Sequence, residues 1–200
     1  MVAAATVRPG RPRSRAVDEA IADACRSLLV EVGYTNLTID GVAERAGVSR
    51  PSIYRRWPSK PTMLWDLLFT TPKDQVVIPH TADLRADLRV WVAQTIEFFA
   101  RPEIVSAFTG LLTEQPIAAA QQARLREPVK AKVDDRLRAA VADGTLRPDT
   151  DVDAIFDMVT GFAIYRATVP QPHGDAPTAD AITDQLLDGV VTRRRPRSGP

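Results

Sequence analysis

The chain has 200 residues, of which 44% are hydrophobic and 26% are charged, and its formal net charge is +1. This is the composition of an ordinary soluble protein that buries its core without disulfides, and the single cysteine, Cys25, excludes a disulfide within the chain. No segment approaches the roughly 20 apolar residues of a membrane span, and the N-terminus lacks the pattern of a secretory signal, so we expect a cytoplasmic protein.

Positive charge is concentrated near the N-terminus. Residues 1–70 hold ten Lys and Arg against seven Asp and Glu, a net charge of +3. Residues 49–60 contain four basic residues and no acidic one. Such a local concentration is typical of a surface that binds phosphate groups.

The first part of the chain divides into an arm and a helix. Residues 1–15 lack periodicity and contain two prolines and a glycine, so we expect a flexible basic arm. Apolar residues then recur at helical spacing, which predicts a helix over 16–32. Gly33 is the expected C-terminal cap of that helix.

Two short helices follow. The second helix begins at Thr38, whose hydroxyl can cap it, and Gly47 permits a tight turn after it. Ser49 is expected to cap a third helix, on which Ile53 and Trp57 are spaced to point inward together.

The rest of the chain is predicted to be helical, apart from its linkers and its end. A fourth helix runs from Ser59 to about Thr70, and residues 71–80 form a linker. Residues 194–200 are expected to be disordered. Further helices are predicted over 84–99, 102–119, 125–143, 151–169 and 178–193.

Two short helices joined by a glycine turn form a helix-turn-helix, in which the N-terminal end of the second helix enters the major groove of DNA. Arg50 lies at that end and can donate two hydrogen bonds to O6 and N7 of guanine. Pro51 lacks an N–H and can contribute only shape. Tyr54, Arg55 and Arg56 suit phosphate oxygens beside the groove. On spacing alone, a merely solvated charged face is an equal alternative.

The segment from Gly33 to Lys60 closely resembles the DNA-binding signature of the TetR family, in the runs Ala46-Gly47-Val48-Ser49, Ile53-Tyr54 and Ser59-Lys60. The resemblance covers residues 16–68. Many members carry an aromatic residue and a histidine where this chain has Arg55 and Arg56. The positions that match DNA-contacting sites of the family are Thr38, Ser49, Arg50, Pro51, Ser52, Tyr54, Arg55, Arg56 and Lys60.

The same resemblance implies an all-α fold in two parts. A three-helix helix-turn-helix DNA-binding domain spans 16–58, and a connecting helix and linker span 59–80. A C-terminal helical bundle over 81–193 is implied for ligand binding and dimerisation. Within it, residues 143–166 resemble one common subgroup of TetR C-terminal domains.

The N-terminal arm carries a separate hypothesis. Its run Arg8-Pro9-Gly10-Arg11-Pro12-Arg13 resembles the Gly-Arg-Pro core of AT hooks. Arg11 and Arg13 would then enter a narrow minor groove, where the negative potential is enhanced. A solvated tail is the equal alternative.

The architecture of the family places the dimer interface on the last two long helices. Burial inside one protomer is the alternative for some of their apolar residues. The interface candidates are Ile155, Phe156, Val159, Ala163, Ile182, Leu186, Leu187 and Val190.

A ligand cavity is expected among the predicted helices over 84–99, 102–119, 125–143 and 151–169. No cluster of charges there indicates an ionic effector, so a mostly apolar small molecule is expected. An aromatic stripe at helical spacing is, however, more often core than pocket. The ligand candidates are Trp91, Thr95, Phe98, Phe99, Phe108, Leu112, Met158, Phe162 and Tyr165.

Two other function classes compete with a DNA-binding regulator. An enzyme is disfavoured, because His80 and His173 lie in separate predicted loops and no zinc motif, phosphate-binding loop or nucleophile elbow is present. No cofactor or metal is expected. A helical interaction module without DNA binding is disfavoured by the basic third helix.

The expected mechanism joins these elements. The partners are double-stranded operator DNA, a small-molecule effector and a second copy of the chain, with no membrane. Two recognition helices would bind a pseudo-palindromic operator, and the effector would change their separation by tilting the helix over 59–70. Repression relieved by the effector is expected, with activation or co-repression as the alternative.

Overall fold

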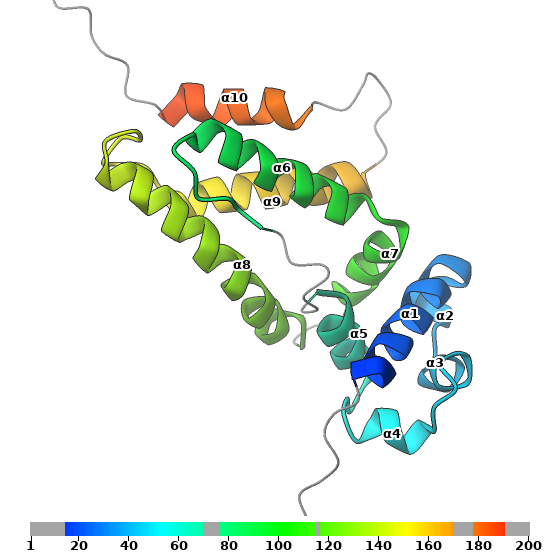
Figure 1. The fold of residues 1–200 in the computed structure, drawn as a ribbon. Coiled ribbons are helices and arrows are strands. Elements are labelled where there is room, and N and C mark those ends of the chain that lie inside the picture. Colours follow the sequence, from blue (N-terminus) through cyan, green and yellow to red (C-terminus); the bar gives the residue numbers. More distant parts are fainter. Residues whose placement is uncertain (1–14, 70–76, 115–116, 170–177, 191–200) are drawn as a thin grey trace, which may run out of the picture.

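The computed structural model describes residues 15–69, 77–114, 117–169 and 178–190, and for residues 117–128, 189 and 190 it describes the backbone alone. These ranges hold α-helices and no β-strand (Figure 1), as the periodicity predicted. The first five helices are α1 (Arg15–Glu31), α2 (Gly33–Asn36), α3 (Ile39–Arg45), α4 (Arg50–Tyr54) and α5 (Lys60–Phe69). The others are α6 (Leu84–Ala100), α7 (Pro102–Leu111), α8 (Ile117–Ala142), α9 (Val152–Thr168) and α10 (Ala179–Val190).

Local signals place several of these boundaries. Thr38 caps α3 as predicted, because its Oγ1 accepts a hydrogen bond from the backbone N–H of Gly41 at 3.1 Å. Ser59 accepts a longer bond from the N–H of Thr62 at the start of α5, at 3.4 Å. Gly47 has a φ of +65°, a left-handed conformation that most side chains disfavour, so a glycine is needed in this turn.

Two boundaries differ from the predictions. The helix expected over 102–119 ends at Leu111, and the one expected over 125–143 begins at Ile117. Pro116 stands in the sequence directly before α8, and residues 115 and 116 lie outside the described residues. Gly33 has a φ of +75° after α1, but it also opens α2, a single turn that the periodicity did not reveal.

One hydrophobic core joins the N-terminal helices to α7. Residues of α1, α3, α4 and α5 pack together, and the end of α6 and one face of α7 pack into the same cluster. This core therefore extends beyond residue 80, where the sequence suggested a division. Its fully buried members include Ile21, Leu29, Ile53, Met63, Leu64, Leu68, Ile104 and Leu111.

Tyr34 is the main polar link between α2 and α7. Its backbone N–H donates to Oγ of Ser106 at 3.1 Å, and its hydroxyl donates to Oε1 of Glu114 at 3.1 Å. Burial, followed by the bond to Glu114, raises the pKa of Tyr34, so this hydroxyl stays protonated and remains a donor. The link holds the N-terminal helices firmly against α7.

A second core lies among α6, α8, α9 and α10. Helix α6 packs against both α9 and α10, as Figure 1 shows. Trp91 of α6 stacks on Phe156 of α9 with ring centroids 6.0 Å apart. Arg85 and Arg89 of α6 form ion pairs with Asp184 and Asp180 of α10. These contacts orient α10 along α6.

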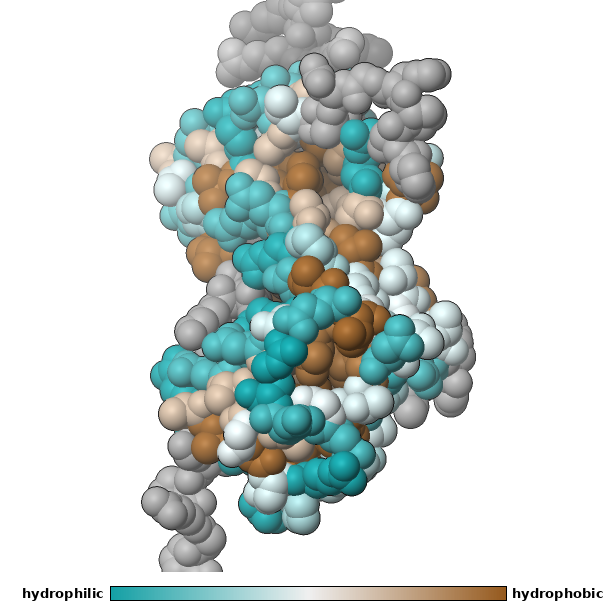
Figure 2. All heavy atoms as spheres, turned by 90° about the vertical axis from the view of Figure 1, so that its right-hand side faces the viewer, coloured by the Kyte–Doolittle hydropathy of each residue, from teal (hydrophilic) through white to brown (hydrophobic). Residues whose placement is uncertain are grey.

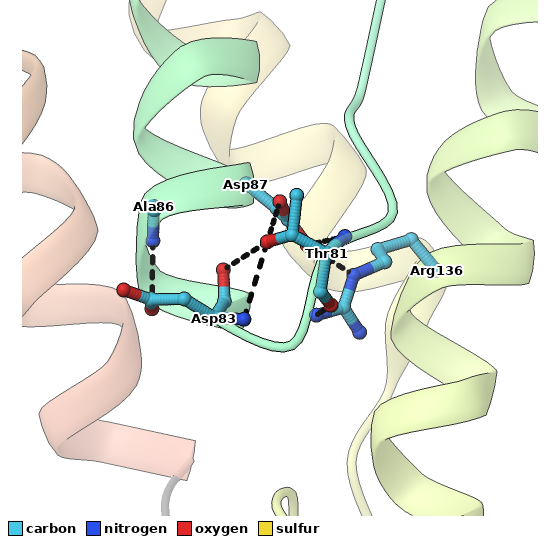
Figure 3. A network of polar contacts seen from close by, with 5 residues as sticks. All are labelled: Thr81, Asp83, Ala86, Asp87 and Arg136. Atoms are coloured by element: carbon cyan, nitrogen blue, oxygen red, sulfur yellow. Dashed lines mark hydrogen bonds and ion pairs between the residues drawn. The ribbon is translucent and has the colours of Figure 1, made fainter.

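A buried ion pair fixes α8 to the start of α6 (Figure 3). Asp87 and Arg136 have side chains only 1% and 6% exposed, and Nε of Arg136 lies 2.6 Å from Oδ2 of Asp87. Thr81 completes the network, because its backbone N–H and its hydroxyl both donate to the Asp87 carboxylate and its carbonyl accepts from Arg136. Both carboxylate oxygens of Asp87 thus accept hydrogen bonds, as expected for a buried charged group.

The surface retains exposed apolar side chains. On the face drawn in Figure 2, brown hydrophobic patches lie among teal hydrophilic groups in both halves of the molecule. Individual large apolar residues that are at least 50% exposed include Val30, Tyr54, Met158 and Tyr165. The last two lie on α9, next to a groove described below.

Candidate nucleic-acid interface

Helices α3 and α4 form the predicted helix-turn-helix. The turn between them is closed by a hydrogen bond from the N–H of Val48 to the carbonyl of Ala43, 2.9 Å long. Ile53 is fully buried and Trp57 is 5% exposed, which confirms that they point inward. The opposite side of α4 therefore faces solvent.

The start of α4 presents polar and basic groups outward. Ser49, Arg50 and Pro51 are exposed, and Ser52 is half-buried. Ser49 occupies the cap position, but its Oγ lies 2.8 Å from Oγ of Ser52 and makes no bond to a helix N–H. These two hydroxyls satisfy one another in the free protein.

Arg50 has one acidic partner. Its Nε lies 2.7 Å from Oδ1 of Asp40, the second residue of α3, and the two side chains are 63% and 48% exposed. An ion pair at the surface of the motif thus links the first turns of its two helices. This contact was not predicted, because its two residues lie on different helices.

Tyr54 and Arg55 lie at the C-terminal end of α4. Tyr54 is 52% exposed, and Arg55 is also exposed. Their placement agrees with side chains that reach the DNA backbone beside the groove.

Arg56 and Lys60, which the sequence grouped with the DNA contacts, turn inward. Arg56 forms an ion pair with Asp18 of α1 and is only 16% exposed. Nζ of Lys60 donates to the carbonyl of Tyr34 at 2.9 Å and lies 4.1 Å from the centre of the Tyr34 ring. Burial lowers the pKa of Lys60. Arg56 therefore links the end of the helix-turn-helix to α1, and Lys60 links the start of α5 to α2.

Further braces hold the motif and were not foreseen. Arg45 of α3 donates to both carboxylate oxygens of Glu31 in α1, at 2.8 and 2.7 Å. The indole Nε1 of Trp57 donates to Oδ2 of Asp66 in α5 at 2.7 Å. Partners so far apart in sequence leave no local pattern, so only the fold reveals them.

The other N-terminal and catalytic candidates are the arginines of the arm, the histidines and the cysteine. Arg11 and Arg13 lie outside the described residues, as does His173. Cys25 is buried, and burial raises the pKa of its thiol to about 12, so it stays protonated. Among the described residues, no three His, Cys, Asp or Glu side chains gather to hold a metal, and no helix is long and apolar enough to cross a membrane.

The predicted ligand residues separate into three places. Phe98, Phe99 and Phe108 belong to the first core, where their rings pack edge to face. Trp91 lies in the second core and is 1% exposed, and Thr95 donates its hydroxyl to the carbonyl of Trp91 at 2.8 Å. The remaining candidates, Leu112, Met158, Phe162 and Tyr165, are exposed or half-buried.

The predicted dimer residues also divide. Some are buried within this chain, in the second core or beside it: Ile155, Phe156, Val159, Ala163 and Leu187. Ile182 and Leu186 are partly buried, and the side chain of Val190 lies outside the described residues.

An open groove of about 390 Å³ runs between α9 and α10. Some of its residues were predicted to bind a ligand and others to form the dimer interface. The structure therefore brings members of the two predicted sets together in one groove. Its lining is mostly apolar and consists of Met158, Val159, Phe162, Ala181, Ile182, Gln185 and Leu186.

Two family models match the chain. Residues 21–65 match the bacterial regulatory proteins of the tetR family, and residues 78–186 match the tetracyclin repressor-like C-terminal domain. The first match covers the helix-turn-helix with its supporting helices. The second covers more than half of the chain and spans α6 to α9 and most of α10.

Individual proteins agree with these matches. The chain is 26% identical over 185 residues to YdeS, an uncharacterized HTH-type transcriptional regulator of Bacillus subtilis (strain 168), with 91% of this chain and 89% of the relative covered. It is 27% identical over 169 residues to the DNA-binding transcriptional repressor TetR of Mycobacteroides abscessus, with 80% and 86% covered. The crystal structure of the TetR family transcription regulator SCO0332 is similar with a TM-score of 0.67, 30% identity and 88% and 99% coverage.

Proposed function

This chain belongs to the TetR family of DNA-binding transcriptional regulators, and we propose that it is a dimeric repressor that a small, mostly apolar molecule releases from its operator. The matched families and relatives are regulators, so the protein is a regulator and not an enzyme. The repressor role, the dimer, the effector and the contact residues are the proposed parts.

The observation that carries the proposal is the exposed start of α4. Arg50 and Arg55 have no role in the core, because both are exposed at the two ends of α4, whereas Ile53 and Trp57 are buried. Arg50 would read guanine from the major groove, while Thr38, Tyr54 and Arg55 would contact the backbone. Because Arg56 is paired with Asp18 and Lys60 is bonded to the carbonyl of Tyr34, the proposed contact set is smaller than the family positions suggested.

Dimerisation is supported by the apolar groove between α9 and α10. A monomeric protein rarely leaves such a surface uncovered, and two helices from each of two copies would form a four-helix interface. Exposed Met158 and Tyr165 on α9 would join it. A twofold dimer would then place its two α4 helices in successive major grooves, about 34–36 Å apart on a pseudo-palindrome.

Release by an effector is supported by the continuous first core. Leu64, Leu67 and Leu68 of α5 pack in the same cluster as α7, so a displacement of α7 would move the reading head. Two of the ligand candidates, Phe99 and Phe108, pack against this core and are only partly buried. The FadR of Bacillus subtilis, which shares the fold at 17% identity and a TM-score of 0.66, was solved in complex with stearoyl-CoA, so a protein of this fold can hold a ligand with a long acyl chain.

The test is selection of bound DNA from a random pool, with the native protein and with Arg50→Ala. We expect the native protein to enrich an inverted repeat, and R50A to lose base preference at one position in each half while keeping measurable affinity. If the native protein enriched no sequence at low salt while folded, the proposal would be wrong. A uniform, salt-dependent loss in R50A would assign Arg50 to phosphate instead.

A further inference from the structure

Asp40 is an acidic residue at the proposed DNA-binding surface, where basic side chains are expected because DNA is negatively charged. It lies in the first turn of α3, and its carboxylate meets Arg50 at the first turn of α4. Phosphate groups repel a carboxylate, so an acid at this place reduces the affinity for DNA in general. Its position therefore calls for a function other than binding the backbone.

We propose that Asp40 is a positioning residue that sets base specificity by holding the guanidinium of Arg50. This inference rests on the proposed role of Arg50 in reading DNA. The contact is made to Nε, with 2.7 Å between Nε and Oδ1 of Asp40. A guanidinium is planar and carries five N–H donors, of which four belong to the two terminal nitrogens. Those two nitrogens form the fork that pairs with O6 and N7 of one guanine.

The ion pair restricts how that fork can be used. An unrestrained arginine at the surface can pair with guanine through either edge, or turn aside to a phosphate oxygen. With Nε engaged by Asp40, only the approach through the two terminal nitrogens remains for a base. The arginine also loses less rotamer freedom on binding, because part of it is lost already in the free protein.

Other polar groups near Arg50 are engaged elsewhere, which leaves Asp40 as the residue that holds its guanidinium. Two other arginines of the motif have acids of their own, since Arg45 of α3 pairs with Glu31, and Arg56, which follows α4, pairs with Asp18. Ser49 and Ser52 are engaged with each other. Asp40 is therefore the acidic group that orients Arg50.

Stability is expected to change little when the pair is broken. Both side chains are largely in solvent, and exposed ion pairs contribute little to folding. The function of the pair should thus appear in binding and not in the melting temperature. Glu31→Gln is a matched control, because it removes an exposed carboxylate from another arginine pair of the same motif and changes the net charge equally.

The experiment measures dissociation constants for the selected operator and for three variants of it, each changed at the base pair that R50A identifies. Native protein, Asp40→Asn, Glu31→Gln and R50A are compared at two salt concentrations. We expect D40N to lose at least about fivefold of the discrimination among the four DNAs, and to bind the mismatched DNAs more tightly than native protein. E31Q should discriminate as native protein does.

Three results would overturn the inference. D40N could discriminate as well as E31Q, or it could alter the preference at a different base pair, which would make Asp40 itself a base contact. In both cases the effect of R50A would stand, and so would the proposed function. If R50A itself left the base preference unchanged, Arg50 would not be the reader, and its proposed role would fall together with that of Asp40.

Discussion

Gly110 allows α7 to approach the ring of Tyr34 more closely than any other residue would. A Cβ atom at Gly110 would lie 2.1 Å from Cγ of Tyr34, far inside van der Waals contact. The ring cannot simply move away, because Glu114 and Ser106 hold Tyr34 at both ends. The glycine is thus required by packing between the N-terminal helices and α7.

We predict that Gly110→Ala lowers the free energy of unfolding by about 1–3 kcal/mol, the usual effect of overpacking. The gain in helix propensity, about 1 kcal/mol, works in the opposite direction and is smaller. Urea unfolding followed by circular dichroism measures the difference.

The matched control is the same change in a Tyr34→Ala background. Without the ring, Gly110→Ala should be neutral or stabilising, and the two substitutions should be strongly non-additive. Additive effects would show that the ring is not the obstacle.

At the residue scale, the sequence predicted which residues of α4 and the following turn are buried, but not the contacts that Arg56 and Lys60 make with other helices. Ile53 and Trp57 followed from spacing, because a buried face repeats at helical intervals. Arg56 and Lys60 looked identical in kind to Arg55. Only the fold brings Asp18 to Arg56 and the carbonyl of Tyr34 to Lys60, since both partners come from elsewhere in the chain.

At the scale of elements, the ion pair of Asp87 and Arg136 determines how α8 sits on α6. We predict that Asp87→Asn lowers the free energy of unfolding by about 3–5 kcal/mol, because it leaves the Arg136 cation buried without a charged partner. Asp184→Asn, which breaks the exposed pair with Arg85, is the control and should change stability by about 1 kcal/mol or less. Equal effects of the two substitutions would contradict the role of the buried pair.

The same pair predicts a pH dependence. Burial raises the pKa of Asp87, but hydrogen bonds from Thr81 and Arg136 outweigh it, so the folded pKa lies below the usual value. The unfolded chain, with a pKa of about 3.9, then binds more protons than the folded protein just below that pH. The contribution of Asp87 is complete above this range and is lost as the pH falls through the folded pKa.

We therefore expect the stability of native protein to fall more steeply than that of D87N as the pH is lowered from about 5 to about 3. Denaturant unfolding at a series of pH values measures both slopes. Parallel curves would show that Asp87 titrates alike in the folded and unfolded states.

The sequence predicted helices well where an apolar stripe was long and its ends were capped. Helix α6 and helix α9 begin and end within about two residues of the expected positions, and Asp151 caps α9 by accepting from the N–H of Ala154. The end of α7 and the start of α8 were misplaced, because the first of these helices was expected to continue through Pro116 to about Ala119. Helix α2 was missed because four residues carry no period.

At the scale of the whole molecule, the groove between α9 and α10 is expected to be filled by a second copy. We predict that Ile182→Glu weakens the dimer at least about tenfold, because it would place a charge in the apolar centre of the interface. Sedimentation velocity over a range of concentrations measures this change. Asp188→Ala, an exposed position on α10 outside the groove, should leave the dimer intact.

Partner surfaces are the part of this protein that sequence reasoning resolves least. An apolar helix face has the same pattern whether it packs within the chain or against a second copy. Phe156 and Ile182 were grouped together for that reason, yet one is buried against Trp91 and the other lines the open groove. The family resemblance supplied the expected dimer, and the structure shows which side chains remain available for it.

The proposed function requires that two copies of α4 read one DNA site together. Sedimentation velocity with labelled DNA tests this directly, using the selected inverted repeat and a duplex in which one half is scrambled. We expect two chains on the intact repeat and a much weaker complex on the scrambled one, with a smaller difference between the two duplexes for R50A. One chain bound equally well to both duplexes would contradict the account.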